Sequence, residues 1–410
     1  MLKKIKKLSD TNFKALKENF LSLAALQLFS MLLPLFVLPY IIGVLGYDLY
    51  GTIILALTFI SYFQSITDYS FKITATRDIA LNKESKVRLN MIYSKVMIIK
   101  TIFLLVSIII IVSIIVVYPL FYEYKWIFFV TILTLIGNYL FPDWFFQGIE
   151  KMKYITIINT LVRLFFTALI FLLIKTKEDY LLYPILQGGG FFFAGLIGQI
   201  VVFRKYKVKL YPIKIRHIIC TIKRNFPIFI NQVFPMLYNN TTSLILGIYE
   251  SNSMLGVFSA IKKIVELIVA MVGVFSRVFF PILNIKKDLF KTYRKLVLIF
   301  VFLSIIIVLI FKDIIFNFLH INMEGRFELL LILLVGVFGY ALYDIYGLNY
   351  FIVKKKDKMV MYNTILASII GFIISFPLVY YFGIFGAALN LSFSRWLMGG
   401  RLYIKYKQNK

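Results

Sequence analysis

Apolar segments of roughly 20 residues recur along the whole chain, and short polar gaps separate them. A helix of this length rises about 30 Å at roughly 1.5 Å per residue, which matches the thickness of a bilayer core. The pattern predicts twelve membrane-spanning helices, near residues 20–42, 48–71, 96–118, 126–148, 154–174, 180–203, 226–247, 254–283, 296–318, 327–352, 360–382 and 384–403. We therefore expect an all-α polytopic membrane protein whose two termini lie on the same side.

Basic residues are distributed unevenly among the polar gaps. Of the 46 Lys and Arg residues, 34 lie in the termini and in the loops that follow even-numbered spans, 4 lie in the other loops, and 8 lie inside spans. Cytoplasmic loops carry an excess of this kind, so the crowded side and both termini are predicted to be cytoplasmic. The net charge of +27 then reflects topology and attraction to anionic membrane lipids, and we expect no nucleic-acid partner.

The chain divides near its middle, where the loop 204–225 carries eight Lys and Arg residues and separates two sets of six spans. The predicted domains are an amphipathic, basic cytoplasmic N-terminus over 1–19, a six-helix bundle over 20–203, a basic linker over 204–225, a second six-helix bundle over 226–403 and a basic cytoplasmic tail over 404–410. Matches at an offset of about 205, such as Gly51 with Gly256 and Lys72 with Arg277, predict a parallel internal repeat.

The sequence contains few residues that could catalyse a reaction. Its one cysteine, Cys220, and its two histidines, His217 and His320, form no set with metal-ligand spacing. The G-x-x-x-x-G-K-[ST] phosphate-binding loop is missing, so the chain does not carry its own ATPase. We therefore predict a protein that is not an enzyme, with no catalytic residues, no metal and no cofactor. A membrane-embedded glycosyltransferase or polysaccharide polymerase is the alternative from the enzyme class.

Ionisable residues deep inside the spans are the candidates for function. A charge at the bilayer centre costs about 2.5–3.5 kcal/mol on insertion scales, and it persists mainly in a cavity lined by protein or water. These residues are Arg163, Lys262, Lys263, Arg395, Glu266 and Asp344. Four bases against two acids predict a cavity of net positive charge, which suits a phosphate or pyrophosphate group.

A structural role is the alternative for the same charges. Lys262 and Lys263 lie four and three residues before Glu266, so one of them can pair with it on a common helix face. Arg163 or Arg395 could pair with Asp344 between helices. Lys100 is set aside because it lies near a span end, from which its ammonium group can reach the interface.

Neutral polar residues and cytoplasmic bases complete the candidate site. The span 226–247 carries an unusual polar run, in which Asn231, Gln232, Asn239 and Asn240 are the candidates for contact with sugar hydroxyls. The alternative is that these side chains join helices by hydrogen bonds. Lys72, Arg77 and Arg277 are predicted at the cytoplasmic mouth of the cavity, although each also serves the positive-inside bias.

Four stretches of sequence resemble a known family. They are Glu18-Asn19-Phe20, Leu45-Gly46-Tyr47-Asp48-Leu49-Tyr50-Gly51, Thr76-Arg77-Asp78-Ile79-Ala80 and Pro142-Asp143-Trp144-Phe145-Phe146-Gln147-Gly148. Together with the overall pattern of spans, they resemble Wzx-type flippases of the polysaccharide biosynthesis family. That family belongs to a superfamily, called MOP, which also contains multidrug antiporters (MATE) and lipid II flippases.

The resemblance implies a V-shaped, MATE-like pair of six-helix bundles that works by alternating access. The expected substrate is an undecaprenyl-pyrophosphate-linked oligosaccharide, moved from the cytoplasmic to the outer leaflet of the bacterial inner membrane for O-antigen, capsule or exopolysaccharide synthesis. Arg163, Lys262, Lys263 and Arg395 resemble the cationic cavity residues of the family by depth alone. An H+ or Na+ gradient is the implied driving force, with Asp344 or Glu266 as its carboxylate.

The resemblance also implies partners and leaves alternatives open. A polysaccharide polymerase and the chain-length machinery are the further partners that it implies, besides the lipid-linked oligosaccharide and membrane lipids. A multidrug or cation antiporter of the same superfamily is the alternative function, although an antiporter for cationic drugs should carry an excess of acids rather than bases. Lipid II and teichoic-acid precursors also carry a pyrophosphate on a polyprenol, so the sugar composition of the substrate stays open.

Overall fold

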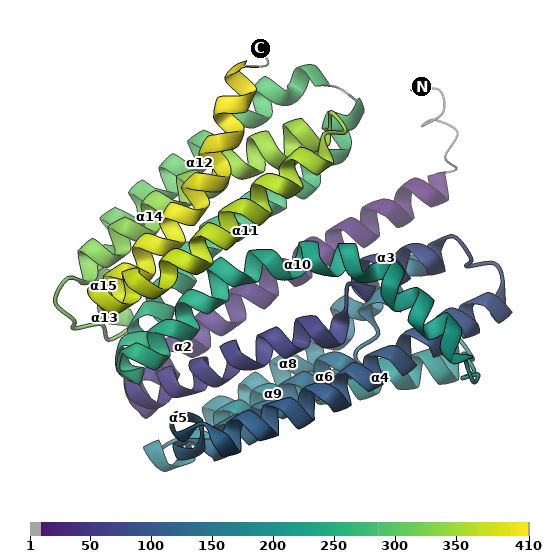
Figure 1. The fold of residues 1–410 in the computed structure, drawn as a ribbon, viewed down its shortest axis with the longest axis horizontal. Coiled ribbons are helices and arrows are strands. Elements are labelled where there is room, and N and C mark those ends of the chain that lie inside the picture. The colour runs from purple at the N-terminus through teal and green to yellow at the C-terminus, as the bar shows by residue number, and fades with distance from the viewer. Residues whose placement is uncertain (1–9, 286, 409–410) are drawn as a thin grey trace. The chain divides into compact units, whose positions relative to one another are not determined.

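The structure is a computed structural model that describes residues 10–285 and 287–408, so residues 1–9 of the predicted N-terminal segment and the last two residues of the predicted tail lie outside it. The described part consists of helices and short connections, without a β-strand (Figure 1). Each predicted span falls on helical residues, which confirms the predicted all-α class. The chain forms two compact units, and each is described here by itself.

Unit 1 contains the chain up to Pro34 and Ile60–Phe229. Its elements are the two outer parts of α2 (Asp10–Asp68), α3 (Phe71–Ala80), α4 (Lys86–Val117), α5 (Pro119–Glu123), α6 (Lys125–Leu140), α7 (Asp143–Gly148), α8 (Lys153–Leu173), the 3-10 helix η1 (Lys177–Leu181), α9 (Leu182–Ile200), the π-helix η2 (Val201–Lys205) and the first part of α10 (Ile215–Tyr249).

Unit 2 contains Leu35–Phe59 and the chain from Ile230 onward. Its elements are the middle part of α2, the rest of α10, α11 (Asn252–Ile285), the 3-10 helix η3 (Lys287–Leu289), α12 (Phe290–Ile310), α13 (Lys312–Phe318), α14 (Arg326–Leu342), the π-helix η4 (Tyr343–Ile352) and α15 (Asp357–Gln408).

Two long helices contain a sharp break at a glycine. Gly46 in α2 has φ 77°, and Gly383 in α15 has φ 51°. This left-handed region disfavours residues that carry a Cβ atom, so glycine permits the chain to turn there and to begin another helix. Both breaks fall in predicted loops between spans, and α2 and α15 therefore each supply two of the predicted crossings.

Small residues allow close packing of helices inside each unit. In unit 1, a Cβ atom on Gly137 of α6 would lie 2.5 Å from the backbone carbonyl carbon of Phe191 in α9. In unit 2, a Cβ atom on Gly399 of α15 would lie 2.0 Å from the backbone oxygen of Gly339 in α14. Ser392 Oγ also donates to the Ile332 carbonyl across the same pair at 2.6 Å. Such small-residue contacts are typical of helix packing in membranes, where no hydrophobic effect joins helices.

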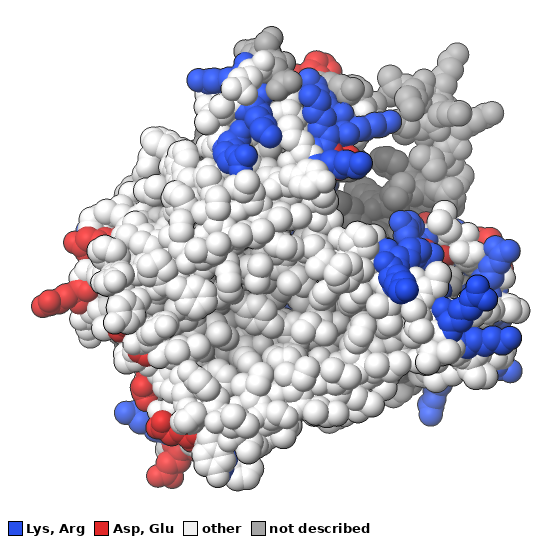
Figure 2. All heavy atoms as spheres, viewed as in Figure 1, with Lys and Arg blue, Asp and Glu red and all other residues white. Residues whose placement is uncertain are grey.

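The surface has the polarity of a multi-pass membrane protein. Figure 2 shows Lys and Arg gathered at one end of each unit, Asp and Glu both there and at the opposite end, and a broad surface without charge between them. Large apolar side chains are exposed on this middle surface, among them Ile109 (66%), Phe302 (57%) and Ile373 (60%), as lipid contact requires. By length and hydropathy, eight helical segments of the described residues can cross a membrane. Helix α10 is not among them because of its polar run.

Candidate functional site

Three helices of unit 2 bring charged and polar side chains together. Lys262 and Glu266 lie on α11, Arg395 lies on α15, and Asn239 and Ser243 lie on α10. Arg395 Nη2 donates to Glu266 Oε1, while Lys262 Nζ donates to the Asn239 carbonyl at 3.0 Å and to Ser243 Oγ at 3.4 Å. We call these five residues the basic cluster. It contains two positive charges and one negative charge.

The basic cluster keeps unused hydrogen-bonding capacity. Arg395 is only 3% exposed, and its Nε and Nη1 atoms have no hydrogen-bond partner among the described residues. Asn239 Oδ1 is buried and lacks a partner in the same part of the chain. Buried donors without partners are destabilising, and a guanidinium group binds phosphate oxygens through paired donors. The arrangement therefore favours an oxyanion as the missing partner of Arg395.

The other two predicted cavity bases contact aromatic rings instead. Lys263 Nζ lies 5.6 Å from the ring centroid of Tyr50 in unit 2, and Arg163 Cζ lies 4.5 Å from that of Phe191 in unit 1. Both distances are within the range of cation–π attraction. Of the four predicted bases, only Lys262 and Arg395 thus meet in the basic cluster.

The pairings that a structural role would give these charges do not form within unit 2. Glu266 pairs with Arg395 rather than with Lys262 or Lys263, because α15 brings a guanidinium group against α11. No salt bridge joins Asp344 to Arg395 among the described residues.

Lys100 also departs from its prediction. Its side chain is only 1% exposed, and its Nζ lies 2.8 Å from Asp68 Oδ1 in unit 1 rather than reaching for the interface. The sequence places Lys100 and Asp68 on different spans, so their spacing along the chain gave no sign of this pair.

Asp344 stands at the centre of a second polar cluster in unit 2. It is fully buried on the π-helix η4, where Oδ2 accepts a hydrogen bond from Tyr293 Oη and one from Asn349 Nδ2 at 3.2 Å. Asn349 Nδ2 also donates to Ser276 Oγ at 2.7 Å. Oδ1 of Asp344 has no partner among the described residues. We call Asp344, Tyr293, Asn349 and Ser276 the Asp344 cluster. π-helical segments of this kind are frequent at functional sites.

Two of the three predicted mouth residues, Lys72 and Arg77, form salt bridges within unit 1. Lys72 Nζ of α3 lies 2.9 Å from Asp143 Oδ2 of α7, and Thr76 Oγ1 donates to the Trp144 carbonyl at 3.1 Å. Arg77 Nε lies 3.7 Å from Asp78 Oδ1. The two stretches that begin at Thr76 and Pro142 therefore form one structural junction. Arg277 is exposed on α11 and belongs to unit 2.

The start of α10 joins the same junction, which the sequence did not indicate. Arg224 Nη2 lies 2.7 Å from Asp78 Oδ2, and Asn225 Nδ2 donates to Thr74 Oγ1 at 3.0 Å. The sequence does contain one sign that this segment is special, because Arg224-Asn225-Phe226 is similar to Glu18-Asn19-Phe20. That similarity does not indicate which residues the segment contacts.

The polar run of α10 divides into two parts. Toward its end, Thr242 is buried and its Oγ1 accepts a hydrogen bond from Asn390 Nδ2 of α15 at 2.7 Å. Here the polar residues join helices. Asn231 and Gln232 are exposed, and Asn239 and Asn240 are half-buried. Among the described residues, no group of three His, Cys, Asp or Glu side chains could hold a metal ion.

Residues 16–286 match the profile of the family described as polysaccharide biosynthesis protein. The chain belongs to this family. This polysaccharide biosynthesis protein is 25% identical over 410 residues to a protein of Escherichia coli (strain K12) named "Putative O-antigen transporter", with 98% of this chain and 99% of the relative covered. A protein of the same name from Shigella dysenteriae is 25% identical over 392 residues, with 93% and 98% covered.

The fold of the chain is like that of solved transporters and flippases. It is similar to the lipid II flippase MurJ in an inward closed conformation, with a TM-score of 0.74 at 16% identity over 94% of this chain and 87% of the other. An inward-facing multidrug resistance MATE family transporter gives a TM-score of 0.70 at 12% identity, over 92% and 94%. All these relatives are named transporters or flippases, which agrees with the prediction of a transport protein rather than an enzyme.

Proposed function

We propose that this protein is a flippase for undecaprenyl-pyrophosphate-linked oligosaccharide repeat units. It moves them by alternating access from the cytoplasmic to the outer leaflet of the bacterial inner membrane, with both of its termini in the cytoplasm. The names of the full-length relatives support a lipid-linked polysaccharide as the substrate class. The single observation that carries the proposal is the buried Arg395 in the basic cluster, whose Nε and Nη1 atoms have no hydrogen-bond partner in the part of the chain that the structure describes.

The chemistry of the basic cluster suits a pyrophosphate. A polyprenyl pyrophosphate presents several anionic oxygens close together, so it can accept hydrogen bonds from Nε and Nη1 of one guanidinium group at the same time. Lys262 adds a second positive charge on the adjacent helix α11. Glu266 holds only the Nη2 side of Arg395, and it thereby fixes the guanidinium plane, while Nε and Nη1 are buried and make no hydrogen bond to the described residues.

The alternative antiporter function fits this cluster less well. A carrier of cationic drugs requires acidic groups that meet the drug, whereas the one acid of the basic cluster, Glu266, is already paired with Arg395. The similarity to MATE transporters concerns the fold alone, because the identities are far too low to carry a substrate.

Asp344 is the proposed coupling carboxylate for an H+ or Na+ gradient, in place of the alternative Glu266. It is buried, no salt bridge joins it to a base among the described residues of unit 2, and its Oδ1 lacks a hydrogen-bond partner there, so this oxygen can take a proton. Replacing Asp344 with Asn should remove the acceleration of transport by an imposed ion gradient in proteoliposomes. Asp313→Asn, an exposed carboxylate on α13 of the same unit, should leave that acceleration unchanged. If transport by Asp344→Asn is still accelerated by the gradient, Asp344 does not couple transport to the ion.

Complementation tests the proposed function in cells. The chain is expressed in a bacterial strain that lacks its O-antigen or capsule flippase but makes the lipid-linked repeat unit. Restored surface polysaccharide, with loss of the lipid-linked intermediate that accumulates inside, is the expected result. Failure in strains covering several repeat-unit structures, combined with new resistance to cationic drugs, would favour the antiporter instead.

A further inference from the structure

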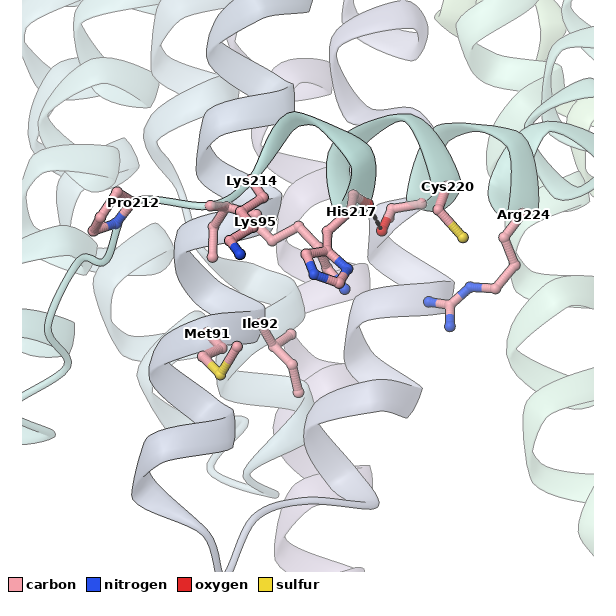
Figure 3. Close-up of a pocket in the computed structure, with 10 residues that line it drawn as sticks. Met91, Ile92, Lys95, Pro212, Lys214, His217, Cys220 and Arg224 are labelled. Carbon is pink, nitrogen blue, oxygen red and sulfur yellow. Dashed lines mark hydrogen bonds between the residues drawn. The ribbon is translucent and has the colours of Figure 1, made fainter.

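A cavity outside the basic cluster opens in unit 1 between α4 and the start of α10. Its volume is about 460 Å³. Lys95 extends into it from α4, Lys214 lies in the segment before α10, and His217 and Arg224 lie on α10 itself (Figure 3). None of the residues that line the cavity is acidic. Asp78 Oδ2 of α3 lies 2.7 Å from Arg224 Nη2. Lys95, Lys214 and Arg224 therefore bring three positive charges to the cavity, against the one negative charge of Asp78.

Part of the cavity wall is apolar. Met91 and Ile92 of α4 line it about one helical turn from Lys95, and Pro212 lines it in the segment before Lys214 (Figure 3). A site for a free inorganic anion needs no such wall, because every face of the ion seeks hydrogen bonds. A wall that is partly basic and partly apolar matches an amphiphile, whose charged headgroup continues into hydrocarbon.

The start of α10 presents apolar side chains in two directions. Ile218 and Ile222 pack against the core of unit 1. Ile215, Ile219 and Phe226 are 73%, 48% and 52% exposed. A helix with exposed apolar residues beside a basic face is typical of the headgroup layer of a membrane. Exposure to that layer gives the cavity access to lipid headgroups rather than to solutes alone.

We propose that this cavity binds the phosphate headgroup of an anionic membrane lipid. Lys95, Lys214 and Arg224 surround the phosphate, and Met91, Ile92 and Pro212 contact the glycerol and the first methylenes of the acyl chains. This lipid is a resident of the membrane and not the transported substrate, so the inference does not rest on the proposed function. The bound lipid ties the start of α10 to α4 at the basic end of unit 1.

Native mass spectrometry of the full-length protein in neutral detergent provides the test. Phosphatidylglycerol and phosphatidylcholine are added in equal amounts, and the lipid adducts are counted. The double variant Lys95→Gln/Lys214→Gln removes two charges from the cavity. The matched control, Arg216→Gln/Lys223→Gln, removes two exposed charges from the same segment that do not line the cavity. Wild type and control should prefer phosphatidylglycerol, and the cavity variant should bind it about tenfold more weakly.

Three results would overturn the inference. Equal phosphatidylglycerol binding by the cavity variant and wild type would show that the cavity is not the site. Equal loss in both double variants would show general surface attraction. Displacement of phosphatidylglycerol by millimolar inorganic phosphate would show a site for free anions. If the double variant aggregates, Lys214→Gln alone gives the same comparison, because that side chain is exposed and its loss leaves no void in the core.

Discussion

Changing Lys262 to Gln or Arg395 to Lys is expected to reduce transport of the lipid-linked oligosaccharide by roughly 10-fold to 100-fold each. A hydrogen bond to a charged group contributes about 1.5–3 kcal/mol, and about 1.4 kcal/mol corresponds to a factor of ten. Arg395→Lys keeps the positive charge that pairs with Glu266, so unit 2 should still fold. It removes the planar fork, in which Nε and Nη1 have no hydrogen-bond partner among the described residues. Initial rates at equal protein level in the membrane are the measurement.

The control for this prediction is Lys295→Gln, which removes an exposed charge from α12 of the same unit. It should transport at the wild-type rate. Wild-type rates in both Lys262→Gln and Arg395→Lys would mean that the basic cluster serves packing alone. Loss of folded protein from the membrane in these variants would point to the same structural role, so protein level is measured alongside transport.

The second prediction with a large effect concerns the contact of α2 with α11 inside unit 2. A Cβ atom on Gly51 would lie 1.7 Å from the backbone oxygen of Asn252, and one on Gly256 would lie 2.5 Å from that of Tyr47. Gly51→Ala therefore forces the two helices apart and should destabilise the protein by about 3 kcal/mol, at the upper end of typical overpacking costs. The expected result is a marked fall in thermal stability in detergent, with little folded protein recovered.

Gly400→Ala of α15 is the matched change for Gly51→Ala. A Cβ atom there meets nothing within 4 Å, so alanine should be neutral or raise stability by about 0.5–1 kcal/mol through helix propensity. Equal stability of Gly51→Ala and Gly400→Ala, measured by thermal unfolding followed by size-exclusion chromatography, would contradict the close packing at Gly51.

The spans could be predicted from sequence because bilayer thickness and the absence of water inside it allow few alternatives. The two positions matched by the predicted repeat, Gly51 and Gly256, come together in one contact of unit 2, where a Cβ atom on Gly256 would lie 3.3 Å from the Gly51 backbone nitrogen. The repeat matched these two glycines as equivalent positions, and it did not predict a contact between them. It could not specify that this contact lies between α2 and α11, since apolar helices carry little information about their neighbours.

The pairing of charges was not predictable for the same reason. Their depth within the spans identified Lys262, Glu266 and Arg395 as charged residues that need a cavity lined by protein or water. Spacing along one helix then favoured a pair of Lys262 or Lys263 with Glu266, but Arg395 comes from α15, more than a hundred residues away, and the fold brings it to Glu266. The surroundings of Asp344 were not predictable either, because Tyr293 and Ser276 of the Asp344 cluster lie on two other helices, α12 and α11.

The most direct test of the flippase function is transport by the purified protein in liposomes. A fluorescent or isotopically labelled oligosaccharide on a polyprenyl pyrophosphate is placed in one leaflet, and its appearance in the other is followed with a membrane-impermeant lectin or glycosidase. Transfer that depends on the wild-type protein and falls at least tenfold in Arg395→Lys is the predicted result. Transfer no faster than in protein-free liposomes, across several oligosaccharides and under an imposed ion gradient, would contradict it.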